Sequence, residues 1–176
     1  MSKTAEIRHD DDEPIEIAIT GELGDDQDEL HESLLSVPAG GPCTIYFNSP
    51  GGDPYCALSL MNVILYRQLQ CTAVVTGECS SAALWPLAAC QTRLVTPLSV
   101  FLFHAARWES GENIGYQEAQ QWARHFEQLA RDSERLLARM LQLPEELVQA
   151  WIQEGRYVTG PELAEHRCVT LWDPTE

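Results

Sequence analysis

The chain has 176 residues, the size of one domain, and 44% of them are hydrophobic while 22% are charged. This composition is that of an ordinary globular protein and excludes global disorder and fibrous structure. The formal net charge is −16, so the overall field opposes binding to the phosphates of nucleic acid or to an anionic membrane surface. We therefore expect neither nucleic acid nor a membrane as a partner.

Residues 1–13 differ in composition from the rest of the chain. They hold the only lysine, Lys3, and an acidic run over residues 10–13. We expect them to form an acidic disordered arm, followed by a single domain over residues 14–176. We find no basic and apolar leader, and the apolar stretches are too short to span a bilayer, so we expect a cytoplasmic location. The six cysteines form no Cys-x-x-Cys pair and four lie in apolar runs, which favours buried thiols over zinc ligands or disulfides.

The first half of the domain predicts alternating strands and helices. Ile15, Ile17 and Ile19 alternate with less apolar residues, as in a half-buried strand. Leucines at helical spacing then predict a helix over 25–36. The same reasoning gives a strand over 43–47, a helix over 57–65, a strand over 71–76 and a helix that opens at Ser80. Two strand–turn–helix units in succession imply an α/β fold with a parallel sheet, whose functional loops share the edge at the carboxyl ends of the strands.

The second half is dominated by one long predicted helix, over residues 114–143. A seam of about four heptads is longer than a small core needs to cover. Such a helix either packs along the core or projects to meet its counterpart in another subunit, which would make the protein an oligomer. The seam consists of Ala119, Trp122, Phe126, Leu129, Ser133, Leu136, Met140 and Leu143. The other elements expected here are strands over 93–95 and 100–104, a helix from Pro144 through 152, a capping box between Thr159 and Glu162, and a closing strand over 168–172.

Ser81 stands where a predicted strand turns into a helix. Its neighbours are small enough for a substrate to approach. The unpaired N–H groups and the dipole of a helix N-terminus stabilise negative charge, so the N–H of Ala82 is placed to hold an oxyanion formed when Ser81 attacks a carbonyl. A serine in this position is also an ordinary helix N-cap, so the feature has two interpretations on its own.

Two further segments come to the same predicted sheet edge. The glycines of the sequence Ser49-Pro50-Gly51-Gly52 allow a backbone N–H to point into a cleft. His104 ends the strand over 100–104, where its imidazole would take the proton from Ser81 as a general base, although a histidine after an apolar run is often a core residue. An oxyanion loop, a nucleophile and a base on one edge together favour nucleophilic catalysis.

With these residues in place, the chain resembles the proteolytic subunit of the Clp protease, a serine peptidase with the crotonase-type fold. The resemblance covers nearly everything after the acidic arm. It rests on residues 48–52, on the interval from there to Ser81, on a histidine signature within 93–104 and on a closing segment over 156–164. It implies a ClpP-like fold in which the long helix is the projecting, ring-stacking handle. It also implies the following roles: Ser81 as nucleophile, His104 as base, and Gly52 and Ala82 as the donors of the oxyanion N–H groups.

The main departure from the family's pattern concerns the acid of the triad. The family's aspartate stands immediately before Arg156, where this chain has Gly155. Losing the acid typically lowers turnover by about 10⁴, while the nucleophile, base and oxyanion hole keep residual activity. We rank Glu154 first as a substitute, with Asp53 and Glu109 as alternatives.

Two smaller departures lie beside the predicted nucleophile and base. The Gln-Pro that follows the family's histidine is Ala105-Ala106 here. Pro86, inside the predicted helix after Ser81, lacks the N–H that would bond to Ala82, so we expect a kink there. The pocket beside the nucleophile is therefore expected to differ from the family's.

The leading hypothesis is a serine endopeptidase subunit of an oligomeric Clp-type protease. The resemblance implies a homo-oligomer of stacked rings, a polypeptide substrate and an AAA+ unfoldase as a candidate partner. We expect no cofactor and no metal, because no metal cluster, dinucleotide fingerprint or phosphate loop is found.

Two alternatives come from other classes. The first is a catalytically weakened or inactive subunit that serves as a scaffold or assembly partner, which Gly155 favours. The second is an acyl-CoA enzyme on the same superfold, which would need a cationic pocket that the sequence does not reveal. A Ser-Lys peptidase is disfavoured because Lys3 lies in the arm.

Overall fold

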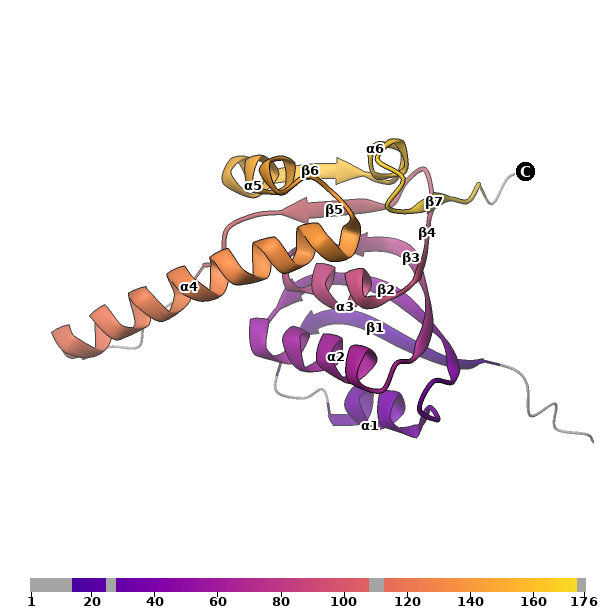
Figure 1. Cartoon of the computed structure of the whole chain (residues 1–176), viewed down its shortest axis with the longest axis horizontal. Helices are drawn as coiled ribbons and strands as arrows, with labels where there is room; N and C mark the ends of the chain where they lie inside the picture. The colour runs from indigo at the N-terminus through magenta and orange to yellow at the C-terminus, as the bar shows by residue number, and fades with distance from the viewer. Residues whose placement is uncertain (1–13, 25–27, 108–112, 174–176) are drawn as a thin grey trace, which may run out of the picture.

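The computed structural model describes residues 14–24, 28–107 and 113–173. The predicted arm over 1–13 and Glu109 lie outside the described residues. In chain order (Figure 1) the elements are β1 (Ile15–Leu23), α1 (Asp28–Ser36), β2 (Pro42–Gly52), α2 (Pro54–Tyr66), β3 (Gln70–Cys79), the 3₁₀ turn η1 (Ser81–Ala83), α3 (Leu84–Ala89), β4 (Thr92–Val95), β5 (Val100–Phe103), α4 (Tyr116–Leu141), α5 (Glu145–Glu154), β6 (Arg156–Thr159), α6 (Gly160–Glu165) and β7 (Thr170–Leu171).

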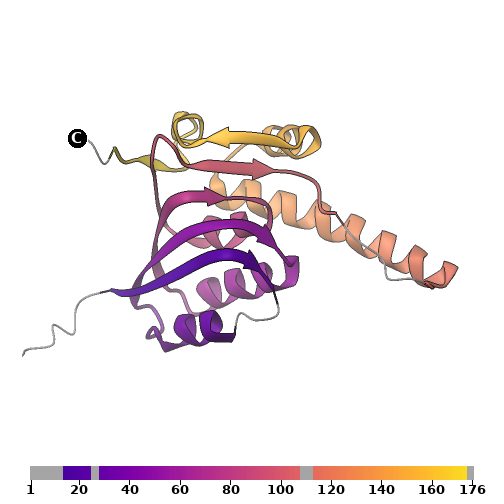
Figure 2. The same ribbon diagram turned by 180° about the vertical axis from the view of Figure 1, so that it is seen from behind.

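The main sheet has the order β1-β2-β3-β4-β7, and all of these pairs are parallel. β5 leaves this path, since it pairs in parallel with the end of β3 and antiparallel with β6. Figures 1 and 2 show α2 and α3 covering one face of β1, β2 and β3. The expected parallel α/β fold is confirmed. β6 was not expected, because its sequence shows no apolar periodicity. In the structure only Val158 of its four residues is buried, which explains the weak signal.

The core is one cluster of buried side chains that extends from Ile17 on β1 to Val169 before β7. Its largest fully buried members include Phe47, Phe101 and Phe103. The first of these lies just before the glycine loop, and the other two lie on the strand before His104. The site is therefore built next to fully buried side chains of the core. Five of the cysteines are buried as small apolar groups: Cys43, Cys71, Cys79, Cys90 and Cys168.

The long helix α4 has nearly the predicted bounds but is buried only near its C-terminal end. Its buried residues are Ser133, Leu137, Ala138 and Leu141. Its N-terminal half extends away from the body of the molecule (Figures 1 and 2). α4 packs mainly against α3 and α5, and Tyr55 of α2 also contacts His125. The heptad seam is therefore only partly buried within this chain.

Two local expectations were wrong. The segment after Ser81 begins as the 3₁₀ turn η1, and the α-helix starts only at Leu84. Pro86 thus lies in the first turn of α3, where N–H groups have no intrahelical partner, so its missing N–H does not require the expected kink. The predicted closing strand over 168–172 is reduced to Thr170–Leu171. None of the described helices is long and apolar enough to cross a lipid bilayer.

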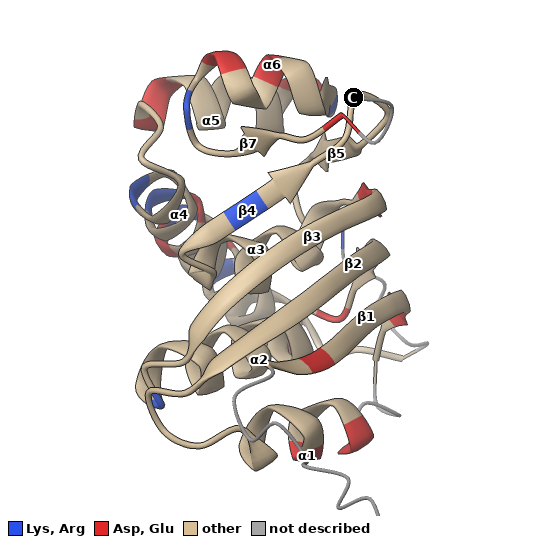
Figure 3. Ribbon diagram, turned by 90° about the vertical axis from the view of Figure 1, so that its right-hand side faces the viewer, with Lys and Arg blue, Asp and Glu red and all other residues tan. Residues whose placement is uncertain are grey.

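Arg93 is the basic residue of β4, and it connects two parts of the chain that are distant in sequence (Figure 3). Its guanidinium donates to the carbonyls of Cys168 and Ala88 at 2.7 and 3.2 Å, and also to the carbonyl of Cys90. Burial lowers the pKa of this guanidinium. Arg93 therefore ties the C-terminal end of α3 to the segment before β7. The acidic residues lie elsewhere, for example on α1 and α6 (Figure 3).

Candidate active site

Ser81 is presented by a tight turn between β3 and η1. Its φ of +54° lies in the left-handed region that non-glycine residues rarely adopt. The preceding Ser80 is extended and fully buried, and its Oγ accepts a hydrogen bond from the N–H of Leu102 at 2.9 Å. Ser80 thus joins the turn to the strand β5 that carries His104. A strained turn from strand to helix is how several hydrolases expose a nucleophilic serine.

His104 follows β5 and makes two hydrogen bonds. Its Nε2 lies 2.8 Å from Ser81 Oγ, and its Nδ1 lies 2.8 Å from the carbonyl oxygen of Ala105. Because a carbonyl only accepts hydrogen bonds, Nδ1 carries the proton. In the neutral ring Nε2 is then the acceptor, and the hydroxyl of Ser81 donates to it. This is the tautomer in which an imidazole serves as a base toward a serine.

The glycine loop at the end of β2 packs against the Ser81 turn. Gly51 and Gly52 have φ values of +97° and +140°, which strain any residue with a Cβ. A Cβ on Gly51 would lie 2.6 Å from the Cβ of Ser81, and one on Gly52 would lie 2.1 Å from the carbonyl oxygen of Leu23. Only glycine fits at either position. The loop therefore packs closely between β1 and the turn that carries Ser81.

A buried serine holds this loop in place. Ser49 is fully buried, and its Oγ donates to the carbonyl of Gly21 at 2.6 Å and accepts from the N–H of Gly51 at 3.2 Å. Its own carbonyl accepts from the N–H of Ser80 at 3.0 Å. The sequence reasoning assigned no role to Ser49 or Ser80. A signal was present for Ser49, which continues the inward-facing alternation of β2 at a position where an apolar residue is normal.

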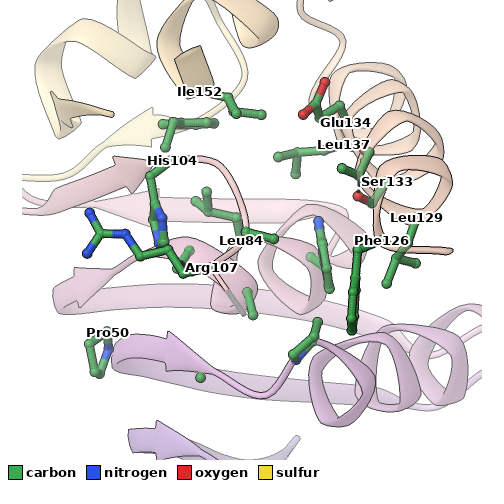
Figure 4. Close-up of a pocket in the computed structure, with 18 residues that line it drawn as sticks. Pro50, Leu84, His104, Arg107, Phe126, Leu129, Ser133, Glu134, Leu137 and Ile152 are labelled. Atoms are coloured by element: carbon green, nitrogen blue, oxygen red, sulfur yellow. Dashed lines mark hydrogen bonds between the residues drawn. The ribbon is translucent and has the colours of Figure 1, made fainter. Parts of the chain in front are cut away.

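A cavity of about 350 Å³ opens beside Ser81 and His104 (Figure 4). Its lining includes Ser81, His104, Gly52 and Ala82, so the structure brings four of the five predicted site residues to one cavity. Ala82 lies in η1, whose first N–H groups lack intrahelical partners, and such amides are the donors that oxyanion holes use. The rest of the wall is largely apolar and comes from α3, α4 and α5: Leu84, Trp85, Phe126, Leu129, Leu137 and Ile152.

The fifth predicted residue, Glu154, is not brought to His104. Glu154 is exposed at the end of α5, and Gly155 caps that helix in a left-handed conformation with φ +67°. The antiparallel pairing of β5 with β6 joins Phe103 to Arg156. Continued by one residue, this register places Gly155 opposite His104, whereas Glu154 is the last residue of the helix α5. The structure shows no hydrogen bond between Glu154 and His104, so the preference for Glu154 as a substitute acid is not supported and stays a prediction.

In the described part of the chain, the partner of His104 Nδ1 is a main-chain carbonyl and not the carboxylate of a triad acid. The carboxylate of Asp53, an alternative, caps α2 by accepting from the N–H of Cys56 at 2.7 Å. Among the residues described, no carboxylate is hydrogen-bonded to His104, and the carbonyl of Ala105 is the partner of Nδ1. Sequence reasoning missed this carbonyl because every residue has one.

Comparisons with known proteins agree with this architecture. A family model described as Clp protease matches residues 15–166. Among solved structures, a mutant of ClpP1 from Listeria monocytogenes matches with a TM-score of 0.76 and 19% sequence identity, and the match covers 89% of this chain and 89% of that chain. At this identity the structural match shows the fold. No curated protein matches this chain.

Proposed function

Because the chain belongs to the Clp protease family over residues 15–166, we propose that it is a serine endopeptidase subunit of a Clp-type protease, with Ser81 as nucleophile and His104 as base. The observation that supports this proposal is the 2.8 Å hydrogen bond between Ser81 Oγ and His104 Nε2. Two features of its surroundings add to this support. The hydrogen bond to the carbonyl of Ala105 sets the tautomer of His104, and both Ser81 and His104 line a cavity.

In the proposed reaction, Ser81 Oγ attacks the peptide carbonyl as its proton passes to His104 Nε2. The N–H groups of Gly52 and Ala82 hold the oxyanion of the tetrahedral intermediate. The imidazolium returns the proton to the leaving amine, and water then hydrolyses the acyl-enzyme by the same steps.

The carbonyl of Ala105 makes this site weaker than a complete triad. It holds the Nδ1 proton and so fixes the orientation of the ring. A neutral carbonyl stabilises the imidazolium less than a carboxylate does, because it carries no full charge. We therefore expect slow turnover with a competent nucleophile.

A covalent probe tests this function better than turnover, because an adduct accumulates even at a slow site. We expect a fluorophosphonate to label Ser81, with the adduct located by peptide mass spectrometry. Labelling should disappear in Ser81→Ala and fall strongly in His104→Ala, while Ser59→Ala, an exposed serine on α2, should label like the wild type. No adduct on the folded, assembled protein would reject the peptidase and leave the inactive scaffold subunit as the function.

We also propose that the subunit forms a homo-oligomer of stacked rings through α4. The exposure of the N-terminal half of that helix supports this, since seam residues such as Trp122 and Phe126 are only half-buried within one chain. In sedimentation velocity, Trp122→Glu should shift the protein to smaller species, whereas Gln121→Glu, an exposed neighbour, should not. We propose a cytoplasmic location and a polypeptide substrate. The candidate partner is an AAA+ unfoldase. The single domain over 14–176 also stays a prediction.

A further inference from the structure

The cavity beside Ser81 has apolar walls but contains a carboxylate. Glu134 of α4 is the acidic side chain among the described residues that line it, and its neighbours in the lining include Leu137 and Ile152. Figure 4 shows Glu134 on the α4 side of the cavity near Ile152, whereas Arg107 lies beside His104. The cavity therefore joins the candidate nucleophile, apolar walls, a negative charge from Glu134 on the α4 side and a positive charge from Arg107 beside His104.

Glu134 has no counter-ion in the described part of the chain. The two arginines nearest to it in sequence are engaged, since Arg131 pairs with Glu127 at 3.2 Å and Arg135 with Glu145 at 3.1 Å. Partial burial and the charge of Glu145 raise the pKa of Glu134. The ionised carboxylate is thus unfavourable in the free protein, and a cation entering the cavity would relieve that penalty.

We propose that this cavity is a specificity pocket for a lysine or arginine side chain on the acyl side of the scissile bond, and that Glu134 is the residue that selects it. The inference rests on the proposed function, because a peptide held for attack by Ser81 is what would place that side chain in the cavity. Lysine and arginine combine an apolar stem with a cationic end. The stem matches the apolar walls, and the cationic end matches Glu134. A neutral apolar side chain would fill the walls but leave the carboxylate unpaired.

The test measures binding, so that it does not depend on turnover. In the Ser81→Ala protein, two product-like peptides that differ only in a C-terminal lysine or norleucine are titrated by calorimetry. We expect the lysine peptide to bind about fivefold or more tightly, as for a partly desolvated charge pair. Adding Glu134→Gln should abolish that preference, while Glu118→Gln, an exposed carboxylate on the same helix, should preserve it. Equal binding of the two peptides, or a preference that survives Glu134→Gln, would overturn the inference.

The variant should remain folded. Because the pKa of Glu134 is raised in the folded state, its ionisation destabilises the protein at neutral pH. Glu134→Gln should therefore melt at a higher temperature than the parent at neutral pH, and this advantage should shrink as the pH falls and Glu134 is protonated. Failure of the probe to label Ser81 would reject the proposed catalysis, whereas equal binding of the lysine and norleucine peptides to the Ser81→Ala protein with Glu134 intact would reject this pocket. The two failures are separate readouts.

Discussion

Replacing Gly155 with aspartate would place a carboxylate opposite His104. The register of β5 and β6, continued by one residue, pairs position 155 with position 104. The Cβ atoms of directly opposed residues lie about 4.5–5.5 Å apart. Nothing lies within 4 Å of a Cβ built on Gly155, and its left-handed conformation is one that aspartate tolerates better than most residues.

The size of the effect follows from what the Ala105 carbonyl already does. The full loss of a triad acid costs about 10⁴ in turnover, but part of that reflects a wrong tautomer, which Ala105 prevents here. The remaining part is stabilisation of the imidazolium. An opposite charge at about 4–6 Å shifts a pKa by about 1–3 units, and each unit is worth about tenfold. We expect Gly155→Asp to raise the rate of probe labelling by about 10- to 1,000-fold.

The matched control is Gly155→Asn, which has nearly the same size and the same tolerance of the left-handed region but no charge. It should label no faster than the wild type. If both variants fold and assemble but label at the same rate, the placement of position 155 opposite His104 is wrong.

Three further predictions concern the framework of the site. Gly51→Ala should abolish labelling and lower the free energy of unfolding by more than about 1 kcal/mol, because the new Cβ would lie 2.6 Å from that of Ser81 at a positive φ. The control Gly24→Ala, which has open space around it, should melt at the same temperature as the wild type. Ser80→Ala should cost about 1 kcal/mol in chemical denaturation and slow labelling, because the partly buried N–H of Leu102 loses its acceptor. Unchanged labelling would show that this bond does not position the site. Arg93→Lys should lower the free energy of unfolding by about 2 kcal/mol, because an ammonium cannot reproduce the three carbonyl contacts of the guanidinium. An unchanged midpoint in chemical denaturation would contradict the role of Arg93 as an anchor.

The sequence by itself predicted most of the elements in their order, β6 excepted, and the two residues that we propose as nucleophile and base. The alternation around Ile17 and Ile19 and the glycines after Phe47 are local signals, because strand period and turn conformation depend on neighbouring residues. Ser81 and His104 were found for the same reason, since each stands where a strand ends and parallel strands end at one edge.

Only the tertiary structure decided how the imidazole is held and what else faces the cavity. The position opposite His104 depends on a register between strands that are about fifty residues apart in sequence, and Glu154 lies before that strand, at the end of a helix. The partner of Nδ1 is a main-chain carbonyl, which no side-chain pattern records. In the sequence Glu134 is one of several charged residues of α4, and the packing of that helix against α3 and α5 is what brings it to the cavity. Long-range packing determines which face of a helix borders a site.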